Sequence, residues 1–208
     1  QDPSNKPWQW TQIAANMLLA ELLEARGQPR AALSLKQSVV QSWERRAAAS
    51  PMELAELDNL SRALLAKGDL LQTLGRRNEA RTDYQRAIDI LTELIERAPG
   101  GHFELGLSIA IGNLAGLELG AKRIAVGQAH LRRCIDLLRQ ALAARDTPQI
   151  RGYLAEALAT LAESERGPAA PEHIDEAVEL LKPHRGHPLL QELLDHLARA
   201  QQAIHARH

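Results

Sequence analysis

The stretch Leu64–Ala87, LLAKGDLLQTLGRRNEARTDYQRA, contains two helical patterns joined by a polar turn that begins at Gly75. Apolar and small residues recur three and four positions apart on both sides of this turn, which is the spacing of one face of a helix. Small residues at Gly68, Ala80 and Ala87 permit close helix contact, and Tyr84 is expected to fill the gap between neighbouring units. Glycine also suits a helix end that turns through a left-handed backbone. The stretch therefore predicts a helical hairpin.

The composition extends this prediction to the whole chain. The 208 residues are 45% apolar and 25% charged, with only 3% aromatic residues. Abundant Ala and Leu favour helices and leave few of the residues that sheets prefer, so we expect an all-α protein with a core of its own. The formal net charge of -1 argues against a nucleic-acid partner, which requires a surplus of basic residues. No apolar run is long enough for membrane insertion.

An internal repeat organises the chain. Gly27, Gly75, Gly120 and Gly167 each end a helical pattern, and their spacings are 48, 45 and 47 residues. Proline-containing breaks separate the units from one another. We expect an N-terminal extension, four helix-turn-helix units and a C-terminal capping helix, with these approximate bounds: 1–10, 11–50, 51–99, 101–146, 147–183 and 187–206.

The second unit resembles a tetratricopeptide repeat (TPR). Its matching positions are Gly68, Leu71 and Gly75 on the first helix and turn, and Ala80, Tyr84 and Ala87 on the second helix. The other three units resemble degenerate copies, and the first has Lys36 where the second has Tyr84. A period of about 47 residues, against 34 in the standard repeat, indicates lengthened helices.

The resemblance implies a right-handed superhelical stack of four hairpins that is not an enzyme and binds a protein or peptide. Such arrays bind partners on the concave surface, which the first helix of each pair lines. The expected partner-binding residues are Met17, Glu21, Glu24, Arg62, Leu65, Asp69, Gln72, Leu107, Ile111, Leu114 and Glu118. These positions lack the Lys and Asn of the carboxylate-binding members of the family. They favour an apolar segment of a partner with a basic residue, which would pair with Glu21, Glu24 and Asp69.

Three alternatives stay open for these positions and for the chain. The Leu and Ile residues of the predicted surface are also what a closed array would bury in its interior or against the ninth helix. The superhelix is also compatible with enclosing a small ligand. A self-association module is the third alternative, with Trp8 and Trp10 or the ninth helix docking into a second copy.

The resemblance also extends to the repeat regions of bacterial multidomain regulators, such as membrane serine/threonine protein kinases. A sensory or recruiting domain of that kind would lie outside the inner membrane, and any other parent protein would place the chain in the cytoplasm.

The residues that could act in catalysis or bind a metal or cofactor form no recognised catalytic, cofactor or metal motif. Cys134 aligns with a small buried repeat position and is expected to be a packed thiol. Trp8, Trp10 and Trp43 are expected to close the N-terminal end of the array. Five of the eight histidines lie in the last 25 residues without the neighbours that complete a metal site, and the full set is His102, His130, His173, His184, His187, His196, His205 and His208.

Overall fold

The computed structural model describes residues 6–99, 102–165, 167–184, 186–188 and 190–206. This part of the chain is all-α, as predicted, with nine α-helices and one short 3-10 helix. The chain divides into two compact units, Gln1–Phe103 and Glu104–His208.

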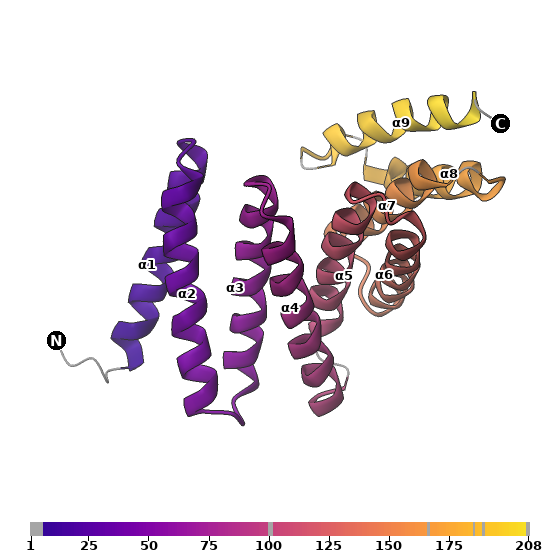
Figure 1. Cartoon of the computed structure of the whole chain (residues 1–208). Coiled ribbons are helices and arrows are strands. Elements are labelled where there is room, and N and C mark those ends of the chain that lie inside the picture. Colours follow the sequence, from indigo (N-terminus) through magenta and orange to yellow (C-terminus); the bar gives the residue numbers. More distant parts are fainter. Residues whose placement is uncertain (1–5, 100–101, 166, 185, 189, 207–208) are drawn as a thin grey trace. The chain divides into compact units, whose positions relative to one another are not determined.

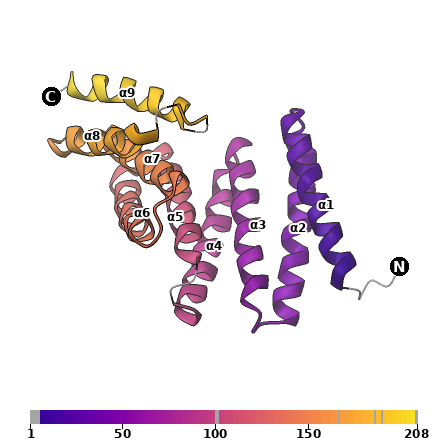
Figure 2. The ribbon, with the colours of Figure 1, turned by 180° about the vertical axis from the view of Figure 1, so that it is seen from behind.

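The first unit consists of two helical hairpins. Its helices are α1 (Lys6–Ala25), α2 (Pro29–Ala49), α3 (Leu54–Thr73) and α4 (Arg77–Arg97). Each helix packs against the next one in the chain, so the four lie side by side, as Figure 1 shows from the front and Figure 2 from behind. Helix α1 begins within the segment expected as an extension, whose residues 1–5 lie outside the described part of the chain.

The second hairpin is built around a close contact between Gly68 on α3 and Tyr84 on α4. A Cβ atom added to Gly68 would lie 2.5 Å from Cε1 of Tyr84, so only glycine leaves room for the ring. Tyr84 is fully buried, and its hydroxyl donates a hydrogen bond to Oδ1 of Asp69 at 2.7 Å. The small-aromatic pattern of the sequence thus sets the distance between the two helices.

In the first unit, the turns inside the hairpins lie at the predicted glycines. Gly27 and Gly75 have φ angles of +71° and +74°, in the left-handed region that glycine adopts without steric cost. The third hairpin departs from this expectation, because Gly120 is the last residue of a helix there. Lys122, with φ +61°, takes the left-handed position instead.

The second unit contains two further hairpins and a final helix. Its elements are α5 (Phe103–Gly120), α6 (Ile124–Ala144), α7 (Pro148–Ser164), α8 (Ala169–Leu181), η1 (Lys182–His184) and α9 (Gln191–His205). Pro148 begins α7, and the Thr147 side chain accepts a hydrogen bond from the backbone N–H of Ile150 at 3.3 Å, which caps that helix.

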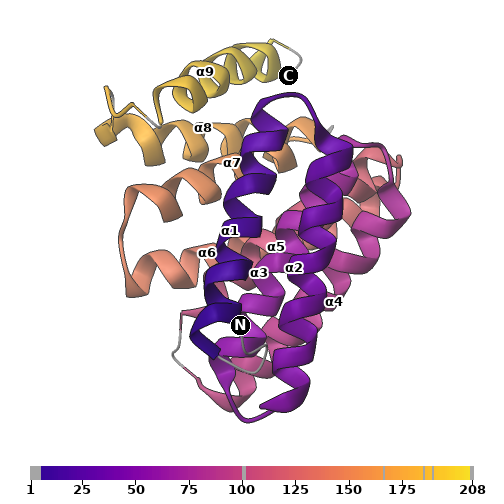
Figure 3. The ribbon, with the colours of Figure 1, turned by 90° about the vertical axis from the view of Figure 1, so that its left-hand side faces the viewer.

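The predicted capping helix is confirmed as α9, which packs against α8 and α7 (Figure 3). Its apolar stripe buries Leu194, Leu197 and Ile204. Leu189, Gly100, Gly101 and His208 lie outside the described residues.

Candidate functional site

The structure places the predicted partner-binding residues in two different environments. In the first unit, most of them line the surface: Met17, Glu21, Arg62, Asp69 and Gln72 are exposed, Glu24 is half-buried and Leu65 is buried. In the second unit all four are buried, with Leu107, Ile111, Leu114 and Glu118 between 0% and 5% exposed.

The buried positions of α5 follow from its sequence. Helix α5 is apolar around most of its circumference, so a hydrophobic face and a ligand-facing face are not separated on it. Ile111 and Leu114 are buried apolar side chains, and Glu118 forms an ion pair with Arg123 of the following turn. These side chains support the fold and offer no surface to a partner.

A hollow in the first unit joins two of the predicted residues to side chains that the sequence reasoning missed. Met17 and Glu21 of α1 form one wall, and Ala63 and Ala66 of α3 form the opposite wall. Val39 and Lys36 of α2 complete the lining. We call this hollow, defined by these six residues, the α1–α3 groove.

The missed residues come from α2 and from the small side chains of α3. The prediction used only the polar and large apolar positions of each first helix, so Val39 and Ala66 were passed over. One signal was available in the sequence, namely Lys36 at the position where the second repeat has Tyr84.

The two repeats use these equivalent positions differently. In the second hairpin the Tyr84 hydroxyl donates to Asp69, and burial raises the pKa of Tyr84 far above its usual value, so this phenol stays a donor. In the first hairpin the Lys36 ammonium lies 2.7 Å from Oε1 of Glu24 and donates to the backbone oxygen of Ala66 at 3.0 Å. The charge of Lys36 is therefore neutralised by Glu24, a residue of α1 next to the groove.

A second hollow, of about 340 Å³, lies between the start of α1 and the end of α2. Trp8 lines it, while Trp10 packs edge-on against the buried Trp43 with ring centroids 4.7 Å apart. The Arg46 guanidinium lies over the Trp10 ring and donates two hydrogen bonds to Glu56, at 2.6 and 2.8 Å. This cation is therefore already neutralised, and the aromatic cluster serves to join the two helices.

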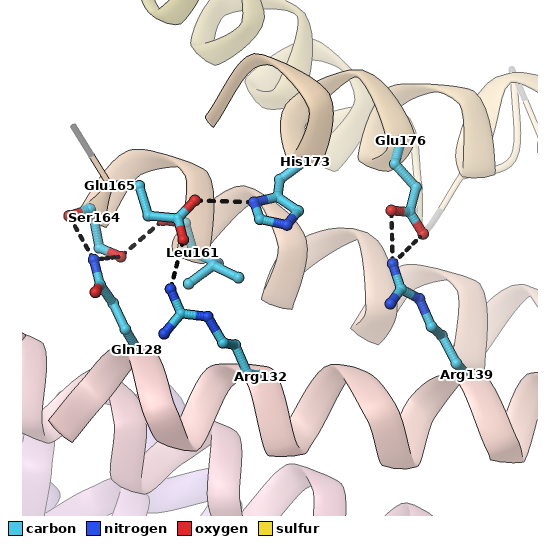
Figure 4. Close-up of polar contacts among 8 residues, drawn as sticks. All are labelled: Gln128, Arg132, Arg139, Leu161, Ser164, Glu165, His173 and Glu176. Carbon is cyan, nitrogen blue, oxygen red and sulfur yellow. Dashed lines mark hydrogen bonds and ion pairs between the residues drawn. The ribbon is translucent and has the colours of Figure 1, made fainter. Parts of the chain in front are cut away.

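Polar side chains of the second unit also pair with one another, as Figure 4 shows for α6 and for the hairpin formed by α7 and α8. Glu165 accepts from Arg132 at 2.8 Å and lies 2.9 Å from Nδ1 of His173. Arg139 donates to both carboxylate oxygens of Glu176. These pairs tie α6 to the end of α7 and to α8.

The described side chains that could bind a metal or act as a nucleophile are not arranged for either role. Within the described residues no three His, Cys, Asp or Glu side chains converge as metal ligands. Cys134 is buried, its thiol donates to the backbone oxygen of Ser108 at 3.2 Å, and burial raises its pKa to about 12. At neutral pH this thiol is protonated, which makes it a poor nucleophile.

The arrangement of the helices is similar to that of a solved structure. The crystal structure of BtubC (BKLC) from P. vanneervenii matches with a TM-score of 0.73 at 16% identity, over 92% of this chain and 71% of that one. A thermophilic TPR protein of Thermus thermophilus covers 90% of this chain at 22% identity, with a TM-score of 0.33 over 98% of its own length. No family model and no curated protein sequence matches the chain.

The chain has a TPR-like fold of sequential helical hairpins. This conclusion rests on the first comparison and on the observed order of the helices. Repeat folds of this kind stack their hairpins into curved arrays with extended concave surfaces. None of the described helices has both the length and the hydropathy that crossing a membrane requires.

Proposed function

We propose that the chain is a non-catalytic protein-interaction module that binds a segment of a partner protein in the α1–α3 groove. The observation that carries the proposal is the exposure of Met17, 40% accessible, above the small residues Ala63 and Ala66. Large apolar side chains on a surface mark contact sites when they adjoin a concave surface. The role that the sequence analysis suggested, a sensory or recruiting domain of a larger bacterial signalling protein, is part of this proposal.

The test fills the groove without changing the fold. Ala66→Leu adds three carbon atoms to a half-buried wall residue, whereas Ala55→Leu makes the same change at an exposed position of α3 outside the groove. Both variants and the wild type are used to select binders from a displayed library of random peptides. Circular dichroism first verifies that the three proteins have equal helix content.

We expect the wild type and Ala55→Leu to retain the selected peptides and Ala66→Leu to lose them. Peptides that bind all three proteins equally would locate the site elsewhere. A selection that yields no specific binder for any of the three would contradict the proposed function.

A second candidate function is self-association through the outer face of α1. Leu18 is 67% exposed, and Leu19 and Leu22 are each 46% exposed, which makes a short apolar stripe. A second copy would bury this stripe in an isologous contact. The expected result is a concentration-dependent mass in sedimentation that Leu18→Glu abolishes, and a concentration-independent monomer mass would exclude it.

A further inference from the structure

The charges around the α1–α3 groove are unequal. Glu21 lies one helical turn after Met17, is exposed, and has no hydrogen-bond or ion-pair partner in the described part of the chain. Glu24, one turn further on the same helix, is paired with Lys36. The carboxylate of Glu24, next to the groove, is thus paired, whereas the carboxylate of Glu21, which lines the groove, has no partner in the described part of the chain.

The repeat explains why Glu21 is unpaired. Glu21 precedes Lys36 by 15 residues, as Asp69 precedes Tyr84, so the two carboxylates are equivalent in successive hairpins. The Tyr84 hydroxyl reaches Asp69, but the longer Lys36 side chain reaches Glu24 instead. The first hairpin therefore keeps the acidic position and lacks the internal donor that occupies it in the second.

The charged residues beside the groove on the facing helix have partners of their own. Asp69 follows the wall residue Ala66 by three positions and so lies on the same face of α3. Arg62, four positions before Ala66, is the basic residue of this face, and its guanidinium lies 3.1 Å from Asp58. Because Lys36 and Arg62 are both paired with carboxylates, Glu21 is the acidic residue of the groove lining that a cation of a partner can reach.

We propose that the α1–α3 groove selects a basic peptide segment, in which one aliphatic side chain packs against Met17 at the mouth of the groove and a neighbouring Lys or Arg pairs with Glu21. This inference rests on the proposed function and names the chemistry of the partner. The apolar walls supply contact area that does not depend on charge, whereas Glu21 distinguishes a basic segment from a neutral or acidic one.

The experiment uses synthetic peptides made from sequences that bind the wild type and are lost on Ala66→Leu. Each peptide is prepared with its basic residue and with Gln or Glu in its place. Their affinities are measured by fluorescence polarisation for the wild type, Glu21→Gln and Glu21→Lys. Glu96→Lys, at an exposed position of α4, controls for the change in net charge.

We expect the Lys-to-Gln change in the peptide to weaken binding to the wild type by about two- to fivefold, as for a surface ion pair. The same change should have no effect on Glu21→Gln, and Glu21→Lys should prefer the Glu peptide. The difference for the wild type should shrink as salt is raised.

Two outcomes overturn the inference and are distinguishable. Peptides that need an open groove but carry no basic residue, or bind Glu21→Gln as tightly as the wild type, refute the charge selection and leave the proposed function standing. Absence of any peptide sensitive to Ala66→Leu refutes both.

Discussion

Replacing Gly68 by alanine tests whether the contact with Tyr84 determines the packing of the second hairpin. The added Cβ would lie 2.5, 2.8 and 3.1 Å from Cε1, Cδ1 and Cζ of the ring. The ring cannot move aside easily, because Tyr84 is fully buried and its hydroxyl is bonded to Asp69. A steric conflict of this kind costs about 1–3 kcal/mol, and contacts this short belong in the upper half of that range.

A second effect of the substitution opposes this loss. Alanine in a helix interior is about 1 kcal/mol more favourable than glycine. The expected net result for Gly68→Ala is therefore a loss of about 1–2 kcal/mol in the free energy of unfolding. Gly116→Ala, in the last turns of α5 with no atom within 4 Å of the added Cβ, should instead stabilise the protein by up to about 1 kcal/mol.

The assay is urea unfolding followed by circular dichroism for the wild type, both single variants and a pair of variants on a Tyr84→Leu background. The shorter leucine removes the ring atoms that the added methyl group would meet, so Gly68→Ala should no longer destabilise on that background. If Gly68→Ala stabilises the wild type as much as Gly116→Ala does, the contact does not constrain the helices and the reasoning is refuted.

Three further predictions concern ion pairs, pH and the final helix. Arg46→Ala leaves the buried Glu56 without its two hydrogen bonds and should lower the free energy of unfolding by about 2–3 kcal/mol. Arg76→Ala, which removes an exposed ion pair, should have no measurable effect on the free energy of unfolding. Equal losses for the two variants would contradict this prediction. Burial raises the pKa of Asp83 although Lys67 partly opposes the shift, so folding favours its protonated form. The stability of the wild type relative to Asp83→Asn should therefore increase as the pH falls from neutrality toward about 4, and a difference that does not change with pH would refute the assignment. Leu197→Ala, at a fully buried position of α9, should cost about 2–5 kcal/mol and accelerate hydrogen exchange along α9, and unchanged exchange there would show that α9 is not held by this side chain.

The fold was readable from the sequence because its signals are local. The glycine period located the hairpins, and the left-handed backbones of Gly27 and Gly75 fit it. The period misplaced the third turn, since a helix can extend through Gly120 when Lys122 accepts the left-handed conformation. A residue such as lysine carries no sequence signal for that role.

The site was less readable because exposure depends on packing between helices. Met17 of α1 and Leu65 of α3 each lie 10 residues before the glycine of their turn, yet Leu65 is buried and Met17 faces solvent. The pairing of Lys36 with Glu24, which leaves Glu21 unpaired in the described part of the chain, depends on the reach of a side chain rather than on spacing. Periodicity gives the face of a helix but not what covers that face.

The aromatic cluster at the start of the chain has a spectroscopic consequence. All three tryptophans, Trp8, Trp10 and Trp43, belong to the first unit, Gln1–Phe103. Intrinsic tryptophan emission therefore follows that unit alone, while far-ultraviolet ellipticity averages over the helices of both. If the two signals change at different denaturant concentrations, the units unfold separately. A bound segment that raises only the midpoint seen by emission would then be assigned to the first unit without any labelled residue.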